Sequence, residues 1–171
     1  MGRSTRAGLW HSRREPATAL IPMSELLFVY GTLRDPDVLG GVLGRPLRPA
    51  ALLPAVAPGF VALHYPGRIY PALVRRPGGT APGLVLTDVS PFERDLLDAF
   101  EGAEYRRGIV AVMLGEELHE AGAYLPAIAV PADAAPWTLE AWQAEHKRRV
   151  LSGEIAGAAE LRAKLIAIRP N

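Results

Sequence analysis

The run Leu26-Leu27-Phe28-Val29-Tyr30-Gly31-Thr32-Leu33 is the most informative stretch of this 171-residue sequence. Five apolar or aromatic residues in a row, ended by a glycine, predict a short buried strand over residues 26–30. A strand that ends in Gly-Thr can turn its next backbone N–H groups toward one point, where they can bind a carboxylate or a developing oxyanion. A glycine at this point permits a positive φ and the close approach of a ligand. An ordinary strand-to-helix turn is the alternative interpretation of the same four residues, 30–33.

Two helix starts follow from residues that commonly cap helices. Asp35 precedes a proline, which fits an N-cap and the first helical position, and Gly44 marks the end of that helix. Ser90 also precedes a proline, and Glu93 three residues later completes a capping box. This second helix is expected to end at Gly102.

The middle of the chain is rich in Pro and Gly and predicts short strands separated by turns. The strand candidates are 60–64, 70–74, 83–88, 108–114 and 121–125, with turns at Pro66-Gly67 and Pro77-Gly78-Gly79. Two helices are expected after them, over about 138–151 and 154–168, with Trp137 and Trp142 in the core. There is too little helix between the strands for a doubly wound fold. We therefore predict an α+β fold in which a small, mixed, barrel-like β-sheet carries a few flanking helices.

The composition excludes several classes of site. The chain has no cysteine, which removes disulfides, cysteine-based zinc sites, iron–sulfur clusters and a cysteine nucleophile. Its four histidines are scattered, so no bound metal is expected. With a formal net charge of +1 and no apolar run of bilayer length, neither nucleic acid nor a membrane is expected as a partner. A cytoplasmic location is expected, and the excess of Arg over Lys, 17 to 2, is a coding bias that hints at a GC-rich bacterial source.

The first 22 residues differ from the rest of the chain. They contain four arginines and one acid, so the remaining residues carry 15 basic against 17 acidic side chains, a charge of −2. This segment has neither helical nor strand periodicity, and it lacks the apolar region of a signal peptide. We predict a disordered, Arg-rich extension over 1–22 and a single domain over 23–171. An over-long start, with Met23 as the natural first residue, is the alternative interpretation of the same segment.

Glu101 stands out because its charge is placed at the wrong end of a helix. It is the last residue before Gly102, where the helix dipole is negative, and it lies at the border of the apolar face. A partly buried glutamate there should have a raised pKa, which suits a general base that later returns its proton. The alternative is a solvated side chain, or one paired with Arg106 or Arg107, and this segment alone favours that alternative.

The order of these segments resembles the gamma-glutamylcyclotransferase-like family, also called AIG2-like. The only departure is Thr32 in place of the commoner serine, and the likeness covers about residues 26–151. The matching segments are Tyr30-Gly31-Thr32-Leu33, Tyr70-Pro71, Gly83-Leu84-Val85, Leu97-Asp98-Ala99-Phe100-Glu101-Gly102, Tyr105-Arg106-Arg107, and Pro136-Trp137 with Trp142.

The resemblance implies a small, barrel-like α/β fold and the release of 5-oxoproline from a gamma-glutamyl amino acid, peptide or amine. The substrate's α-amine would attack its own γ-carbonyl, with Glu101 as general acid and base and no cofactor or metal. The backbone of Tyr30, Gly31, Thr32 and Leu33 would bind the glutamyl group. Tyr105 would position that group or orient Glu101.

Other interpretations stay open at this point. The same fold could carry out a different gamma-glutamyl transfer or cleavage, or serve as a non-catalytic module that binds a small ligand. The leaving group could be an amino acid, a peptide such as glutathione, a polyamine or an isopeptide lysine. Substrate choice is expected to lie in the loops around 66–68 and 75–80, and Arg34 and Arg106 are expected at the solvated surface.

Overall fold

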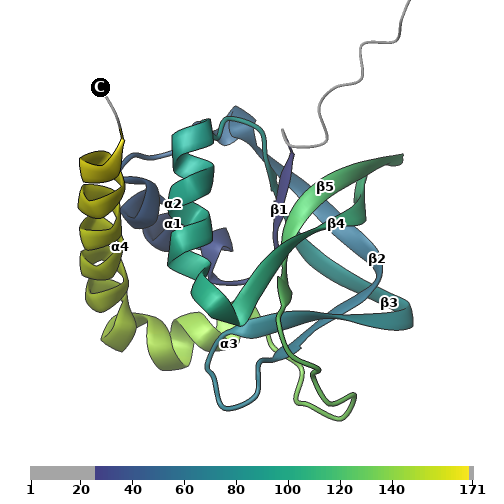
Figure 1. Ribbon diagram of the computed structural model, residues 1–171. Coiled ribbons are helices and arrows are strands. Elements are labelled where there is room, and N and C mark those ends of the chain that lie inside the picture. The colour runs from purple at the N-terminus through teal and green to yellow at the C-terminus, as the bar shows by residue number, and fades with distance from the viewer. Residues whose placement is uncertain (1–25, 170–171) are drawn as a thin grey trace, which may run out of the picture.

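The computed structural model describes residues 26–169, and five strands form a closed barrel within it (Figure 1). Neighbouring strands follow the order β1-β3-β2-β4-β5, and β1 closes the barrel by pairing in parallel with β5. The strands are β1 (Leu27–Val29), β2 (Leu52–His64), β3 (Pro71–Leu86), β4 (Tyr105–Leu114) and β5 (Glu117–Pro126). The predicted α+β fold with a mixed, barrel-like sheet is therefore confirmed. The segment 1–22, predicted to be disordered, lies outside the described residues.

The long β2–β3 hairpin differs from the short strands expected from the sequence. Residues 70–74 and 83–88 were expected as separate strands, yet most of both belong to β3, and residues 52–59 form an unexpected half of β2. The expected turn at Pro77-Gly78-Gly79 is instead a bulge, where the register shifts opposite Gly59. Gly59 and Gly78 both have positive φ there, at 78° and 76°. A bulge tolerates prolines and left-handed glycines inside a continuous strand, so these residues did not end it.

The two predicted helix starts are confirmed. Asp35 caps α1 (Pro36–Leu43) by accepting hydrogen bonds from two backbone N–H groups of its first turn, and the helix ends at Gly44 with φ 74°. Ser90 and Glu93 form the complete capping box of α2 (Pro91–Glu101). Glu101, the residue of interest, is thus the last residue of a helix with a defined start.

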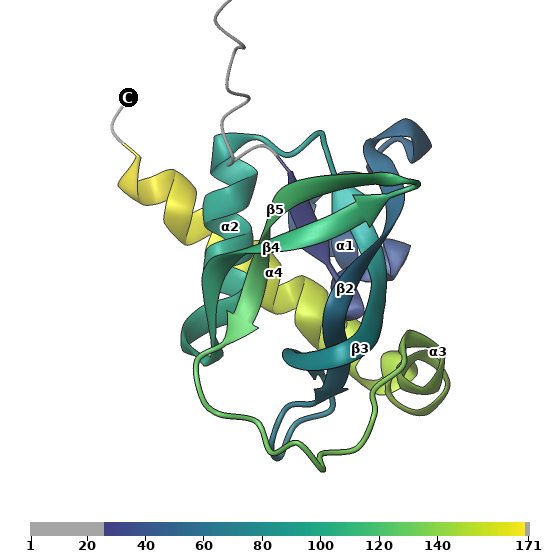
Figure 2. The same cartoon turned by 90° about the vertical axis from the view of Figure 1, so that its right-hand side faces the viewer.

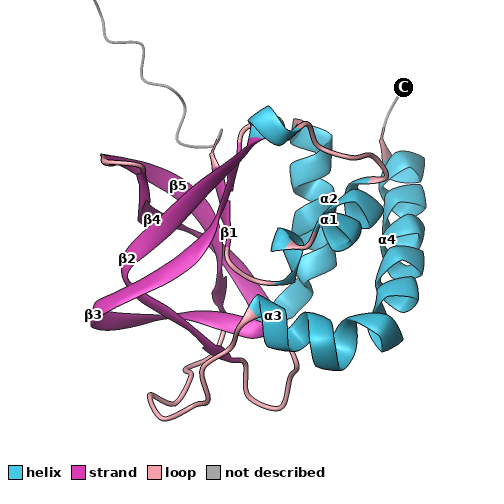
Figure 3. Ribbon diagram, turned by 180° about the vertical axis from the view of Figure 1, so that it is seen from behind, coloured by secondary structure: helices cyan, strands magenta, loops and turns pink. Residues whose placement is uncertain are grey.

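The C-terminal segment is one run of helix rather than two separate helices. It comprises α3 (Leu139–Trp142), the π-helical η4 (Gln143–Lys147) and α4 (Arg148–Ile168). The break expected between 151 and 154 is absent, so that prediction is wrong. The irregularity lies instead in η4, and the ribbon changes direction between α3 and α4 (Figure 3).

Helices α1, α2 and α4 form a layer on one side of the barrel, and the β4–β5 hairpin lies on the side away from α4 (Figures 1 and 2). Strand β1 separates two cores because its side chains alternate. Phe28, with Tyr30 just beyond the strand, packs inside the barrel, whereas Leu27 and Val29 face the helices. Both expected core tryptophans pack in the helix-facing core. The stretch that decides the fold therefore contributes to both cores.

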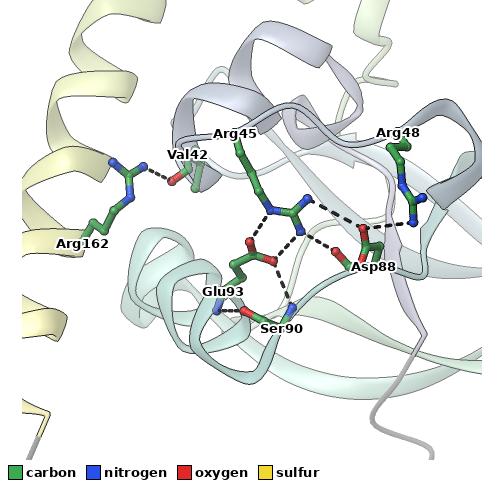
Figure 4. Close-up of polar contacts among 7 residues, drawn as sticks. All are labelled: Val42, Arg45, Arg48, Asp88, Ser90, Glu93 and Arg162. Atoms are coloured by element: carbon green, nitrogen blue, oxygen red, sulfur yellow. Dashed lines mark hydrogen bonds and ion pairs between the residues drawn. The ribbon is translucent and has the colours of Figure 1, made fainter. Parts of the chain in front are cut away.

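Polar contacts connect the helices near the C-terminal end of α1 and the N-terminal end of α2 (Figure 4). Arg45, just after α1, binds the buried Glu93 through Nε at 2.6 Å and Nη2 at 2.9 Å. Arg162 of α4 donates to the carbonyl oxygen of Val42 at 2.7 Å, near the C-terminus of α1. These contacts connect α1 with both α2 and α4, the two helices that contribute acidic residues to the site described next.

No helix within residues 26–169 is long and apolar enough to cross a membrane.

Candidate functional site

A cavity of about 220 Å³ lies where the chain leaves β1, between the barrel and helices α2 and α4. Its wall combines backbone from the loop after β1 with four tyrosines and three glutamates. The lining residues are Phe28, Val29, Tyr30, Gly31, Thr32, Leu33, Tyr70, Pro71, Phe100, Glu101, Glu104, Tyr105, Tyr124 and Glu154. All six residues singled out from the sequence, Tyr30, Gly31, Thr32, Leu33, Glu101 and Tyr105, are among them.

The loop after β1 turns into the short 3₁₀ helix η1 (Thr32–Arg34). Gly31 precedes it with φ −112°, so the chain does not use the positive φ that a glycine permits. The glycine is needed for space, because a Cβ there would lie 3.0 Å from Cγ of Pro71. The first N–H groups of a helix have no partner inside the helix, so those of Thr32 and Leu33 are available to a bound oxygen.

Glu101 is half-buried at the end of α2, beside this loop. Burial raises its pKa to about 8, and the negative charges of Glu154 and Asp98 add to the shift. The direction is the one expected from the sequence. Pairing with Arg107 was the alternative, but that guanidinium binds Asp98 at 2.7 Å. No basic residue within 26–169 forms an ion pair with Glu101. Such a pair would lower the pKa of the carboxyl group, so its absence leaves the pKa raised.

The tyrosine hydroxyls of the cavity donate to protein acceptors. Tyr30 donates to the carbonyl oxygen of Tyr124, Tyr124 to Asp98 Oδ1 at 2.7 Å, and Tyr70 to Glu104. Burial raises the pKa of all these phenols, that of Tyr70 to about 12. They are therefore protonated at neutral pH and act as fixed donors that hold the cavity wall.

Tyr105 has a different partner from those expected. Its hydroxyl donates to the carbonyl oxygen of Pro71 at 2.5 Å, not to Glu101. Burial raises its pKa far above the ordinary value. Pro71 is also the residue whose ring approaches Gly31. Tyr105 thus holds the residue that packs against the η1 loop. That it positions the glutamyl group or orients Glu101 stays a prediction, and both residues line the same cavity.

Several lining residues were not singled out from the sequence as site residues. Tyr70 and Pro71 had a weak signal, because they belong to a strand candidate and to one of the segments that resemble the family. Glu154 had none, since a glutamate on an exposed-looking helix is ordinary. The expected specificity segments, 66–68 and 75–80, do not line the cavity, and the second is part of β3 rather than a loop.

Arg34 and Arg106, which lie next to the motif residues in the sequence, differ in how exposed they are in the structure. Arg34 is half-buried in a second groove, lined also by Trp137 and Glu140, instead of at the solvated surface. Arg106 is exposed, as expected. Within residues 26–169 no cluster of three or more His, Asp or Glu side chains is arranged to hold a metal ion.

Known proteins share both the sequence pattern and the fold. The sequence profile described as "Gamma-glutamyl cyclotransferase, AIG2-like" matches residues 27–144. AIG2-like protein A of Arabidopsis thaliana is 32% identical over 128 residues, which cover 73% of this chain and 76% of that protein. AIG2-like protein C of the same plant is 39% identical over 88 residues, about half of each chain. The expected bacterial source stays a prediction.

Two solved structures are similar to this one. The solution structure of an Arabidopsis thaliana protein is 32% identical, with a TM-score of 0.58 over 75% of this chain and 87% of that chain. A structure titled "Gamma-glutamyl cyclotransferase" has a TM-score of 0.53 at 19% identity, over 85% and 88% of the two chains, and shows a shared fold. The profile match spans well over half of the sequence and includes the η1 loop and Glu101. The chain therefore belongs to the gamma-glutamyl cyclotransferase, AIG2-like family.

Proposed function

We propose that this protein releases 5-oxoproline from a gamma-glutamyl amino acid, peptide or amine. The observation that carries the proposal is the half-buried Glu101, with a pKa of about 8 and no basic partner within residues 26–169, beside the backbone N–H groups of the η1 loop. The family to which the chain belongs supports the same reaction class.

The reaction needs a group that moves a proton between two nitrogens. Glu101 accepts a proton from the substrate's α-ammonium, and the freed amine attacks the γ-carbonyl carbon to form a five-membered lactam ring. As the bond between the γ-carbon and the leaving nitrogen breaks, Glu101 returns that proton to the leaving nitrogen. The ring nitrogen then loses its second proton, which also passes through Glu101 to the freed amine, and the amine leaves as an ammonium ion. No water is consumed, and no net proton is gained or lost.

A pKa of about 8 suits both halves of this transfer. A carboxyl group with the ordinary pKa of 4.5 would hold a proton from an amine poorly, whereas the raised value brings base and amine closer together. The N–H groups of Thr32 and Leu33 stabilise the oxyanion that forms on the γ-carbonyl oxygen. The cavity favours the folded glutamyl conformer that places amine and carbonyl in contact.

The test measures 5-oxoproline release from a panel of gamma-glutamyl compounds: an amino acid adduct, a dipeptide, glutathione, an amine adduct and an isopeptide. The wild-type protein is compared with Glu101→Gln and with Glu116→Gln, an exposed glutamate in the turn after β4. We expect Glu101→Gln to lose a factor of about 100 or more in kcat, and Glu116→Gln to match the wild type.

A folded Glu101→Gln protein that kept its turnover would contradict the role of Glu101. Absence of product from the whole panel with the wild-type protein would contradict the proposed reaction. It would favour another gamma-glutamyl chemistry or a binding role.

A further inference from the structure

The second groove, of about 460 Å³, adjoins the cavity, because Tyr30 lines both. Its charge has the opposite sign. Two arginines and one glutamate line the groove, whereas three glutamates and no basic residue line the cavity. The arginines are Arg34 of η1 and Arg76 of β3, and the glutamate is Glu140 of α3. The groove therefore has a net positive charge and favours an anion.

Arg34 is half-buried, and its guanidinium has no acceptor among residues 26–169. Burial lowers its pKa, and the negative charge of Glu140 opposes this shift without forming an ion pair. An arginine stays protonated at neutral pH all the same. A half-buried guanidinium without an acceptor is costly, and a carboxylate can accept two parallel hydrogen bonds from it.

Arg76 adds a second cation that is held in place. Its Nη2 donates to the carbonyl oxygen of Ala132 at 2.7 Å, which connects β3 with the segment that follows β5. This bond uses one N–H of the guanidinium, and no carboxylate within the described part of the chain pairs with the rest. Arg76 is therefore positioned beforehand and keeps donors for a ligand.

The remaining wall of the groove is mainly apolar and is fixed by backbone contacts. Val61 and Leu63 of β2 line it, together with Pro136 and Trp137. Leu63 and Pro136 form an isolated β-bridge, and the N–H of Trp137 donates to the carbonyl oxygen of Ala62 at 3.0 Å. A preformed apolar wall beside two cations fits a ligand that has both an apolar body and a carboxylate.

We propose that the second groove binds an apolar monocarboxylate, with its carboxylate on Arg34 and Arg76 and its apolar part against the wall that includes Trp137. This inference goes beyond the proposed function and does not depend on it. Two cations against one exposed carboxylate, that of Glu140, match a single negative charge on the ligand. The three glutamates of the neighbouring cavity repel the same ligand, so the two sites select opposite charges.

The test titrates isotope-labelled protein with 3-phenylpropionate, 3-phenylpropan-1-ol and 3-phenylpropylamine, which are nearly equal in size, and with acetate. Backbone amide and indole signals are followed by NMR. We expect 3-phenylpropionate to bind about 10-fold or more tightly than each of the others, and this preference to weaken as salt is added. The largest shifts should fall on Val61, Leu63 and the indole N–H of Trp137, not on Phe100 and Glu101 of the cavity.

Single substitutions identify the groups that hold the carboxylate. Arg34→Gln should weaken binding of 3-phenylpropionate about 10-fold, and Arg76→Gln about 3-fold or more, because each removes a charged donor. Glu140→Gln removes the competing negative charge and should tighten binding about 2-fold. Arg106→Gln is the matched control, at an exposed position of β4 outside the groove, and should bind like the wild type.

Equal binding of the acid and the alcohol by the wild type would overturn the inference, as would unchanged binding by both Arg34→Gln and Arg76→Gln. Shifts confined to Phe100 and Glu101 would also overturn it, because the ligand would then occupy the cavity. If Arg34→Gln does not fold, unchanged binding by Arg76→Gln and Glu140→Gln overturns it. Absence of 5-oxoproline release would contradict the proposed function alone, since these titrations involve no turnover.

Discussion

The raised pKa of Glu101 makes the folding stability of this protein depend on pH. Its pKa is raised from 4.5 to about 8 in the folded protein, so between these values the folded state binds a proton that the unfolded state has released. Folding stability therefore falls as pH rises through this window. The contribution of Glu101 to the free energy of unfolding is largest below pH 4.5. Over the same window the carboxylate form, which is the proposed base, becomes more abundant.

This argument predicts opposite pH responses for stability and activity. Glu101→Gln should be more stable than the wild type at pH 8, by about 1–2 kcal/mol, and the difference should shrink toward pH 5. The measurement is the urea denaturation midpoint of both proteins from pH 5 to pH 8.5, alongside wild-type kcat/KM, which should rise toward pH 8. A Glu101→Gln protein that is less stable than the wild type at pH 8 would refute the argument.

At the scale of single elements, helix α2 matters because it carries Glu101 at its end. Its start is defined by Ser90, whose hydroxyl accepts the N–H of Glu93 at 3.1 Å, while the Glu93 side chain accepts the N–H of Ser90 at 3.0 Å. The same carboxylate binds Arg45, which follows α1. The cap therefore stabilises the helix at the end opposite the cavity.

Removing this cap should lower stability without altering the chemistry. Ser90→Ala is expected to reduce the free energy of unfolding by about 1 kcal/mol, because it leaves an N–H group of the first turn unsatisfied. Ser152→Ala is the matched control, because it replaces a serine at an exposed position inside α4 that caps no helix. It should change the free energy of unfolding little. Chemical denaturation of both variants checks this, and an equal effect of the two substitutions would contradict it. Turnover at 25 °C should match the wild type in both.

The sequence predicted elements well where the signal is local. The caps at Asp35 and Ser90 involve contacts within three residues, so their residue types are sufficient to identify them. The long hairpin was harder, because Pro and Gly in β2 and β3 have the composition of turns. Their bulge is stable only because each strand has the other as a partner.

For the molecule as a whole, closure of the barrel depends on the three residues of β1. They pair with β3 on one side and with β5 on the other, so β1 sits between two strands that are far apart in sequence. Gly83 of β3 allows the close approach: a Cβ there would lie 2.5 Å from Cε2 of Phe28, and closer to the carbonyl oxygen of Val29. Gly122 of β5 is less crowded, with its nearest atom at 3.6 Å.

These two glycines provide a matched test of barrel closure. Gly83→Ala should destabilise the protein by about 2 kcal/mol or more, because backbone and a buried ring cannot both move away. It should also reduce turnover, since β1 leads directly into the η1 loop. Gly122→Ala should be nearly neutral in both respects. Denaturation midpoints and 5-oxoproline release report the two effects, and similar midpoints for the two variants would contradict this account.

The sequence alone determined the features that depend on neighbours along the chain. These are the buried strand, expected over 26–30 and found over 27–29, the caps of α1 and α2, and the ordered motifs that identify the family. The charge of Glu101 at a helix C-terminus singled out this residue, but only the order of motifs along the chain pointed to it as the candidate acid and base. Only the tertiary structure placed Glu154 in the same cavity as Glu101, because the two residues are 53 positions apart in the sequence. The physical reason is that capping and periodicity are satisfied within a few residues, whereas the groups that share a cavity depend on how helices pack on the barrel.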